Sequence, residues 1–287
     1  MIVAIASGKG GTGKTTVAVS LALSLTEPVC LLDCDVEEPN CHLFLKPEIT
    51  RREAVGVAVP LVDEKKCDGC GKCAQVCQYN ALAVLKNGVL VFAELCHGCG
   101  GCALACPSRA ITEGSREVGV VETGRAGRVL FVHGRLRVGE ALAPPLIRAV
   151  KKCTAHDMAN IIDAPPGTSC AVITAIRDSD YVILVTEPTP FGLHDLRLAV
   201  AVVRQLGISF GVLINRADSG DDRVGKYCRE EDIPVLLEIP DDRRIAEAYS
   251  RGVPLVEALP EYRARFAKLW QATAAAASKA GHDGAQR

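Results

Sequence analysis

The fold is decided by the stretch Ser7-Gly8-Lys9-Gly10-Gly11-Thr12-Gly13-Lys14-Thr15-Thr16. It matches the pattern G-x-x-x-x-G-K-[ST], a loop whose backbone amides cradle phosphate groups. An apolar segment over 2–6 precedes it and predicts a strand, and the apolar spacing over 14–25 predicts a helix. A strand, this loop and a helix in that order are the setting that supports such a match. The sequence therefore predicts a nucleotide phosphate site near its first residue.

The residue types of this loop suit the binding of a triphosphate. Glycine adopts backbone conformations that other residues avoid, so its amides can turn inward toward phosphate oxygens. We expect Lys14 to reach the β- and γ-phosphates and the Thr15 hydroxyl to ligate Mg²⁺. The predicted nucleotide contacts in the loop are Gly8, Lys9, Gly10, Gly11, Thr12, Gly13, Lys14, Thr15 and Thr16.

The early lysine of the loop goes beyond the general pattern. The run Lys9-Gly10-Gly11-Thr12-Gly13-Lys14-Thr15-Thr16 resembles the deviant phosphate loop of the MinD/ParA/Mrp superfamily of P-loop ATPases, which includes the nitrogenase iron protein. The resemblance implies that Lys9 crosses a dimer interface and contacts the nucleotide of the partner. It therefore implies a nucleotide-dependent homodimer, or a heterodimer with a related ATPase. By itself, a second lysine in such a loop is also compatible with a solvated charge.

Two acidic residues lie at the end of the second predicted strand, which covers 29–33. The segment reads Asp33-Cys34-Asp35, and ligands of α/β sheets bind where parallel strands end. The resemblance implies that Asp35 orients the attacking water, with Asp33 in a supporting position. The alternative is a pair of solvated acids in a loop.

A second strand-end acid comes much later in the chain. The segment over 158–163 is apolar and ends in Asp163-Ala164-Pro165-Pro166-Gly167, which resembles the Walker B strand and switch of the same superfamily. We expect Asp163 to hold Mg²⁺ through water and the Gly167 amide to approach the γ-phosphate. The resemblance further implies that Asn215, after a strand over 210–214, reads the adenine edge. It also places backbone contacts to the base near Pro240.

The cysteines point to a second kind of site. Eight of the fourteen cysteines form two runs, Cys67-x₂-Cys70-x₂-Cys73-x₃-Cys77 and Cys96-x₂-Cys99-x₂-Cys102-x₃-Cys106-Pro107. This is the bacterial ferredoxin pattern twice, in which the fourth cysteine of each run ligates the other cluster. We therefore expect one [4Fe–4S] cluster on Cys67, Cys70, Cys73 and Cys106, and a second on Cys96, Cys99, Cys102 and Cys77. Zinc knuckles and disulfides are the alternatives.

Two further cysteines remain open. Cys153 and Cys170 flank the strand over 158–163. They are compatible with plain core residues or with a labile cluster shared across a dimer, as in the nitrogenase iron protein.

Composition limits the classes of function. The net charge is −1 and aromatic residues make up 4%, which argues against nucleic-acid partners. No apolar run approaches the roughly 20 residues that span a bilayer. We see no signal peptide at the start of the sequence, and expect a cytoplasmic protein without membrane contact.

The predicted fold is a doubly wound, mostly parallel α/β sheet interrupted by an inserted α+β ferredoxin-like domain. We expect an ATPase domain over 1–59 and 115–280, the insert over 60–114 and a tail over 281–287. A hairpin is predicted over 112–138. After the last strand, we predict a connecting loop over 250–257 and a helix over 261–279 that packs on the domain.

The resulting hypothesis is a Mg²⁺-dependent ATPase, slow without its partner, that couples its nucleotide state to electron transfer toward a redox or small metal-cluster protein. The cofactors implied are ATP or ADP, Mg²⁺ and two [4Fe–4S] clusters. One alternative is an iron–sulfur assembly or carrier ATPase of the Mrp/Nbp35 type. Another is a MinD/ParA-like positioning ATPase whose clusters are structural.

Overall fold

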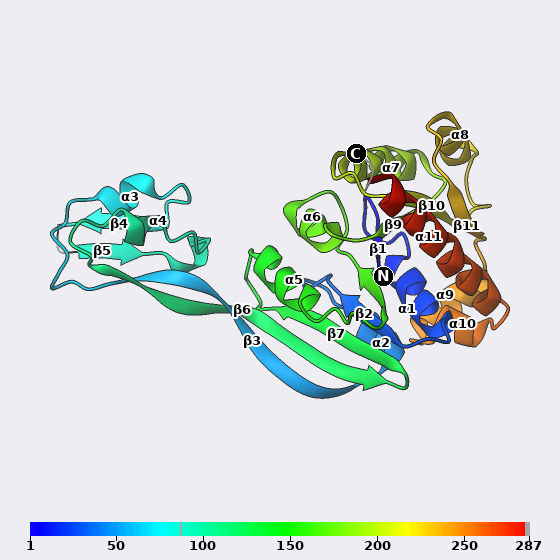
Figure 1. Cartoon of the computed structure of the whole chain (residues 1–287), viewed down its shortest axis with the longest axis horizontal. Coiled ribbons are helices and arrows are strands. Elements are labelled where there is room, and N and C mark those ends of the chain that lie inside the picture. The colour runs from blue at the N-terminus through cyan, green and yellow to red at the C-terminus, as the bar shows by residue number, and fades with distance from the viewer. Residues whose placement is uncertain (87, 285–287) are drawn as a thin grey trace. The chain divides into compact units, whose positions relative to one another are not determined.

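The chain forms two compact units in the computed structural model, which describes residues 1–86 and 88–284 (Figure 1). The first unit comprises Met1–Arg52, Val121–Arg135 and Ile147–Arg287, and the second comprises Glu53–Val120 and Leu136–Leu146. The second unit contains the whole predicted insert, 60–114, and extends beyond it at both ends. It is wider because two long strands run on from the first unit into it.

A nine-stranded sheet has the strand order β11-β10-β9-β1-β8-β2-β7-β6-β3. Neighbouring strands from β11 to β7 are all parallel, which confirms the predicted mostly parallel sheet. The bounds are β1 (Ile2–Ala6), β2 (Val29–Asp33), β3 (Glu48–Val62), β6 (Ile111–Ala126), β7 (Val129–Leu136), β8 (Ala159–Asp163), β9 (Tyr181–Thr186), β10 (Phe210–Asn215) and β11 (Val235–Ile239).

The central strands are mostly apolar, as expected where helices cover both faces of a parallel sheet. Every residue of β2, β8 and β9 is buried. Along β1, Val3 and Ile5 belong to the core on the face that carries α1 (Lys14–Ser24). The register places Asp33 beside Asp163, so the acidic ends of β2 and β8 meet at one edge.

Helix α11 (Tyr262–Gly284) packs against α1, and α10 (Leu255–Ala258) packs against both. Four large side chains of α11 are buried in the core: Tyr262, Phe266, Leu269 and Trp270. This confirms that the last helix packs on the domain. The helix continues past 279 to Gly284, so its predicted end was too early. Residues 285–287 of the predicted tail lie outside the described residues.

The prediction of a plain loop over 250–257 was wrong. Helix α9 (Arg243–Ser250) ends there and α10 begins at Leu255, directly after Pro254. Leu255 and Val256 are buried in the same core as α1. Burial of these two side chains stabilises a helical turn that local sequence does not signal.

Further helices belong wholly or partly to the first unit. They are α2 (Cys41–Leu45), α5 (Ala143–Lys151), which reaches into the second unit, α6 (Cys170–Ile176), α7 (Pro190–Gln205) and α8 (Arg223–Glu230). Helix α7 begins with Pro190, and the Thr189 side chain caps it by accepting from the Gly192 amide. This is a standard N-terminal arrangement.

The second unit has its own small core. An antiparallel pair, β4 (Leu82–Leu85) and β5 (Gly88–Val91), lies with two packed helices, α3 (Lys72–Val76) and α4 (Gly101–Leu104), and a 3₁₀ turn, η1 (Ala93–Leu95). Its buried apolar residues include Cys73, Leu82 and Ile111. Both β3 and β6 extend into this unit, and the hairpin of β6 and β7 turns at Gly127, with φ 57°.

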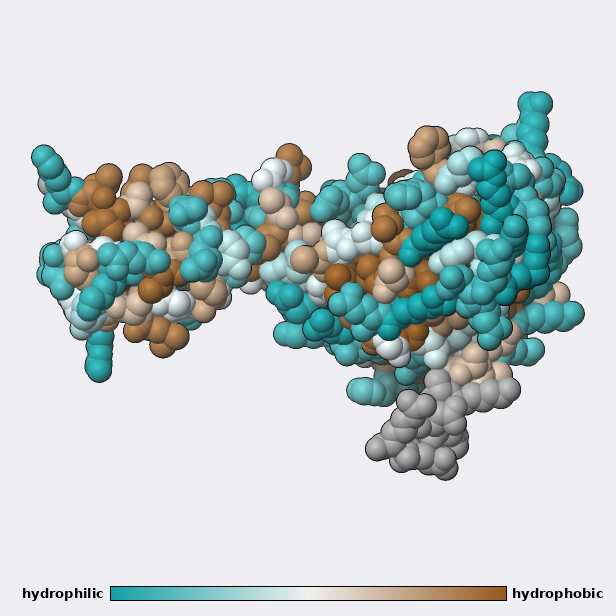
Figure 2. Space-filling view, turned by 90° about the horizontal axis from the view of Figure 1, so that it is seen from above, coloured by the Kyte–Doolittle hydropathy of each residue, from teal (hydrophilic) through white to brown (hydrophobic). Residues whose placement is uncertain are grey.

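Many apolar side chains of the second unit are exposed, and Figure 2 shows apolar patches on its surface. Leu104 is 89% exposed and lies between two cysteines of the second run. Such a surface on a small unit is typical of a protein contact. Within the described residues, no helix has both the length and the apolar character needed to cross a membrane.

Candidate functional site

The glycine-rich loop joins β1 to α1 as predicted. Gly11 and Gly13 have φ values of 77° and 95°, in the left-handed region that favours glycine. A Cβ at Gly13 would meet the side-chain nitrogen of Asn215 at 2.6 Å, whereas one at Gly10 would meet no atom within 4 Å. The loop is thus tightly packed on one side and open on the other.

The start of α1 has no side-chain cap, and Gly13 occupies the N-cap position. The first amides of a helix lack partners within the helix and favour anions. A cavity of about 390 Å³ opens beside this helix start. Its lining includes Gly10, Gly11, Gly13, Lys14, Thr15, Thr16, Asp35, Pro166, Asn215, Arg216, Pro240 and Asp241. The volume is that of a typical small-ligand site.

Lys14 is the buried cation of the cavity, with 7% of its surface exposed. Burial lowers the pKa of its ammonium group, and the nearby carboxylates of Asp163, Asp35 and Asp33 oppose that shift. A buried ammonium group stabilises anions strongly because little water screens it. The side chain is therefore well suited to bind phosphate.

Asp163 is fully buried at the end of β8, and its Oδ2 accepts from the Thr15 hydroxyl at 2.6 Å. The thiol of Cys41 donates to the same oxygen at 3.3 Å. The other oxygen, Oδ1, is buried without a hydrogen-bond partner among the described residues. A free carboxylate oxygen next to a threonine hydroxyl matches the ligand preference of Mg²⁺.

Asp33 is also fully buried and is held by three backbone amides. Its oxygens accept from the amides of Asp35 at 3.2 Å, Asn40 at 3.0 Å and Cys41 at 3.0 Å. Burial, followed by the charge of Asp163, raises the pKa of Asp33 well above its usual value. Burial also raises the pKa of Asp163. Ligand atoms of Asp33, Cys41 and Asp163 lie within 4.8 Å of one another.

Asp35 lines the cavity just beyond this buried pair. Burial, followed by the charge of Asp163, raises the pKa of Asp35 to about 6. Lys14 acts in the opposite direction. A carboxylate that titrates near neutrality can accept a proton from water, which is the property that a general base requires.

Two predicted contacts are engaged within the protein itself. The Gly167 amide donates to the Ser7 carbonyl at 3.0 Å, and Gly167 has φ 93°. The Asn215 side-chain nitrogen donates to the Thr12 carbonyl at 2.9 Å. Asn215 and Pro240 both line the cavity. For Gly167 to contact a γ-phosphate, its bond to Ser7 must open.

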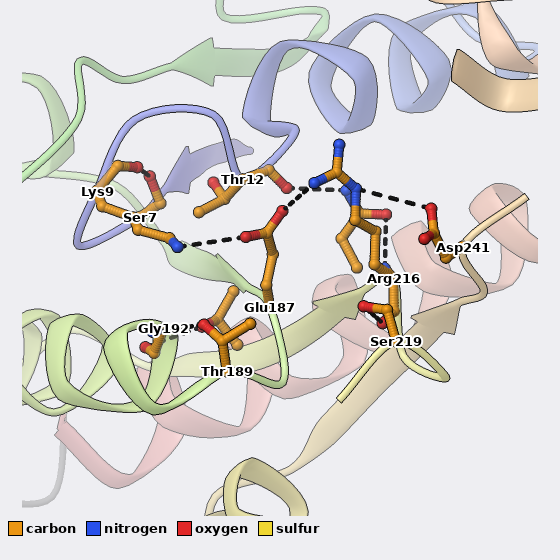
Figure 3. A network of polar contacts seen from close by, with 11 residues as sticks. Ser7, Lys9, Thr12, Glu187, Thr189, Gly192, Arg216, Ser219 and Asp241 are labelled. Atoms are coloured by element: carbon orange, nitrogen blue, oxygen red, sulfur yellow. Dashed lines mark hydrogen bonds and ion pairs between the residues drawn. The ribbon is translucent and has the colours of Figure 1, made fainter. Parts of the chain in front are cut away.

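Lys9 points to a residue of its own chain. Its Nζ lies 3.2 Å from Oε2 of Glu187, which follows β9 (Figure 3). The other oxygen of Glu187 accepts from Arg216 at 3.0 Å, and Arg216 lies 3.9 Å from Asp241. Sequence reasoning missed Glu187, Arg216 and Asp241. They follow the strands β9, β10 and β11, so the rule that ligand sites form at strand ends could have found them.

The eight cysteines of the two runs lie in the second unit and fall into two groups. A cavity there is lined by Cys77, Cys96, Cys99 and Cys102. Burial raises the pKa of Cys73, and the neighbouring thiols of Cys67 and Cys106 act in the same direction. Cys70 is exposed in the loop between Cys67 and Cys73. Cys77 thus lies with the first three cysteines of the second run, and Cys106 lies near Cys67 and Cys73 of the first run.

All fourteen cysteines lie within the described residues, and there none forms a disulfide. The rings of Tyr79 and His97 stack at 3.7 Å beside the cavity lined by Cys77. In the first unit, the Cys30 thiol lies 3.8 Å from the Cys153 carbonyl, and Cys170 is exposed at the start of α6. Cys153 and Cys170 belong to the first unit, whereas the eight cysteines of the two runs belong to the second.

The fold and the cavity define a P-loop nucleotide-binding protein of the α/β class. Residues 3–255 match the model of the CobQ/CobB/MinD/ParA nucleotide-binding domain, and the chain belongs to this family. It is 31% identical over 257 residues to the uncharacterized protein MJ0579 of Methanocaldococcus jannaschii, covering 88% of this chain and 90% of that one. It is 25% identical over 280 residues to an iron–sulfur cluster carrier protein of Aquifex aeolicus, covering 91% and 63%.

Solved structures show the same fold. The septum site-determining protein MinD of Pyrococcus horikoshii, complexed with Mg-ADP, superposes with a TM-score of 0.57 at 21% identity, covering 93% of each chain. MinD of Pyrococcus furiosus gives a TM-score of 0.57 at 22% identity, covering 93% of this chain and 95% of that one. These likenesses agree with the family and with a P-loop ATPase fold.

Proposed function

We propose that this chain is a Mg²⁺-dependent ATPase whose nucleotide state controls electron delivery to a partner protein through two [4Fe–4S] clusters. The observation that carries the proposal is the joining of a P-loop cavity and two groups of four cysteines in one chain. A cysteine set of this number and spacing is not needed for zinc or for a nucleotide.

The nucleotide side of the proposal uses residues that line the first cavity. Lys14 binds the β- and γ-phosphates and stabilises the charge that develops on the transferred phosphoryl group. Thr15 and Asp163 would hold Mg²⁺, which neutralises phosphate charge when bound. Asp35 orients the attacking water and accepts its proton. We assign Asn215 and Pro240 to the base.

Lys9 and Gly167 require a change of conformation in this scheme. Each makes a bond within its own chain, to Glu187 and to Ser7 respectively. We propose that ATP draws Gly167 to the γ-phosphate and that Lys9 crosses to the nucleotide of a second copy. The active form is then a nucleotide-dependent dimer.

The cysteine side fits two clusters. Cys67, Cys70, Cys73 and Cys106 would hold one, and Cys96, Cys99, Cys102 and Cys77 the other. The grouping of the fourth cysteines supports this crossed assignment. When bound, each [4Fe–4S] cluster would accept and release one electron. The exposed apolar side chains of the same unit, such as Leu104, support a protein partner at this surface.

The test compares the reduced protein, purified without oxygen, under three conditions: MgATP, MgADP and no nucleotide. EPR-monitored titration gives the midpoint potentials, and methyl viologen serves as electron acceptor for reoxidation rates. We expect MgATP to shift the potentials or the rates, and the Lys14→Ala variant to show no shift. Identical values in all three conditions contradict the coupling. Absence of iron and sulfide contradicts the clusters.

A second candidate function is cluster assembly, because relatives at 25% identity are named iron–sulfur cluster carrier proteins. The sequence has no further C-x-x-C pair outside the two runs, which disfavours a shared cluster at a dimer interface. Incubation of the loaded protein with an apo-ferredoxin separates the two. Transfer of iron favours the carrier, whereas retention favours electron transfer.

A further inference from the structure

The two cysteine runs share one backbone plan. Glycines with positive φ stand on either side of the second cysteine in both runs: Gly69, Gly71, Gly98 and Gly100. The second cysteine is exposed in both: Cys70 and Cys99. The Ala81 amide donates to the sulfur of Cys77, four residues earlier, at 3.3 Å. The Ala110 amide donates to Cys106 at the same spacing and distance. The backbone thus supports the cysteines of both runs in the same way.

The runs differ in the side chains at two corresponding positions. The first group of cysteines is Cys67, Cys70, Cys73 and Cys106, and the second group is Cys77, Cys96, Cys99 and Cys102. The residue after the first cysteine is Asp68 in one run and His97 in the other. Two residues after the fourth cysteine stand Tyr79 and Ser108 respectively. Because each fourth cysteine lies with cysteines of the other run, Tyr79 and His97 both accompany the second group.

The first group has polar neighbours that are open to water. Asp68 is exposed, and its Oδ1 accepts from the Cys70 amide at 3.2 Å. The hydroxyl oxygen of Ser108 lies 3.5 Å from the sulfur of Cys106. A carboxylate and a hydroxyl both bind water, so they do not exclude it from the sulfur atoms on this side.

The second group lies beside two stacked rings. The ring centres of Tyr79 and His97 are 3.7 Å apart, and the ring planes differ by 8°. Both residues line the same cavity as the cysteines of the second group. Buried apolar side chains also line it: Val59, Ala81, Leu82 and Ile111. Tyr79 is 43% exposed, so the stack forms part of the wall between this cavity and solvent.

We propose that the stack of Tyr79 and His97 shields the second group from water and so makes the two cysteine groups chemically unequal. The inference rests on the proposed clusters and adds the residues that distinguish one from the other. The residues around a metal site control the access of solvent to it. Iron held by the second group should therefore leave more slowly than iron held by the first.

The direct test follows the release of iron from the protein purified without oxygen. Bathophenanthroline disulfonate serves as the chelator, and its absorbance reports the iron that it takes up. We expect two phases of equal size in the wild type. The EPR spectrum left after the fast phase should be the one that Cys73→Ala retains, because that variant keeps only the second group intact.

Variants of the stack should change the slow phase alone. Tyr79→Ser introduces the residue of the corresponding position in the other run, and should make the slow phase about two- to tenfold faster, the range for loss of one aromatic pair. His97→Ser should act in the same way, whereas Tyr79→Phe keeps the stack and the wild-type rate. The matched control is Leu85→Ser on β4, which removes a side chain that is 58% exposed in the same unit and should leave both phases unchanged.

The midpoint potential separates shielding from a general loosening of the unit. Water stabilises the added negative charge of a reduced cluster, and solvent exposure is one of the factors that set its potential. EPR-monitored titration of Tyr79→Ser should thus show a raised potential for the second group and an unchanged potential for the first.

A single phase in the wild type overturns the proposal, as does an unchanged slow phase in both Tyr79→Ser and His97→Ser. Equal shifts of both potentials also overturn it. If the phases differ as expected while MgATP alters neither potentials nor rates, the shield stands and the proposed coupling to ATP fails. A protein without iron refutes the clusters and the shield together.

Discussion

Asp33 and Asp163 are register partners on adjacent parallel strands, and both carboxyl groups are fully buried. Asp35 lies just beyond them and Lys14 provides the neighbouring positive charge. Two buried acids side by side disfavour ionisation of each other. The close carboxyl groups therefore carry an electrostatic cost, which the binding of Mg²⁺ would relieve.

The surroundings of Asp35 make the stability of the nucleotide-free chain depend on pH through this residue. Its folded pKa of about 6 lies above the ordinary value of 3.8, so the folded state binds more protons than the unfolded state between these pH values. The contribution of Asp35 to the free energy of unfolding is therefore fully present below pH 3.8 and is lost as the pH rises through about 6. Asp35→Asn lacks this loss.

We expect Asp35→Asn to be more stable than the wild type at pH 7.5, by on the order of 1–2 kcal/mol, with the difference shrinking toward pH 4.5. Urea denaturation at the two pH values measures it, and Asp157→Asn, on the surface, is the control. A difference that does not vary with pH contradicts the prediction.

ATP hydrolysis should fall roughly 100-fold in Asp35→Asn, as for loss of a general base.

Removal of the Lys14 ammonium group should abolish tight nucleotide binding. A charge-assisted contact to phosphate contributes about 2–3 kcal/mol, so Lys14→Ala should weaken ADP binding roughly 100-fold. Titration with a fluorescent ADP analogue measures this. Lys226→Ala, whose side chain is 69% exposed on α8, should bind as the wild type does. Binding by Lys14→Ala within threefold of the wild type would be incompatible with the site.

The two sides of the glycine loop should respond differently to a methyl group. Gly13→Ala places a side chain at φ 95° and 2.6 Å from Asn215, so it should destabilise the chain by about 1–2 kcal/mol and weaken nucleotide binding. Gly10→Ala meets no atom within 4 Å and should leave the melting temperature of the nucleotide-free chain unchanged. Thermal denaturation of the pair decides the matter, and equal melting temperatures refute the close packing of Gly13.

The crossed cysteine assignment predicts which variants lose the same iron signal. Cys77→Ala and Cys102→Ala should each lose about half of the iron, and the EPR spectrum left behind should be the same in both. Cys73→Ala and Cys106→Ala should share the other spectrum. Cys170→Ala should keep all of the iron. If Cys77→Ala instead matches Cys73→Ala, each run holds its own cluster.

Local sequence predicted the strands β1 and β2 with their bounds, because each is an apolar run next to a clear turn or loop signal. It also predicted the loop and the strand-end acids Asp35 and Asp163, whose positions follow from the order of strand, loop and helix. These features depend on neighbouring residues in the sequence and on the chemistry of a known motif.

The features that were missed depend on distant contacts. Helix α10 exists because Leu255 and Val256 reach a core built by other helices. The polar partners of the phosphate loop, Glu187 and Arg216, join residues far apart in the chain, and no local pattern reports their pairing. The 15-residue strand β3 was not predicted because its residues are mostly exposed and polar at its start.

The placement of β1 in the sheet has a consequence for biosynthesis. Its two neighbours, β8 and β9, begin at Ala159 and Tyr181, so β1 stays unpaired until most of the chain has left the ribosome. The eight cysteines of the two runs, which end at Cys106, belong to the second unit and emerge earlier. If the proposed clusters form on these cysteines, a nascent chain can bind them before it can hold a nucleotide.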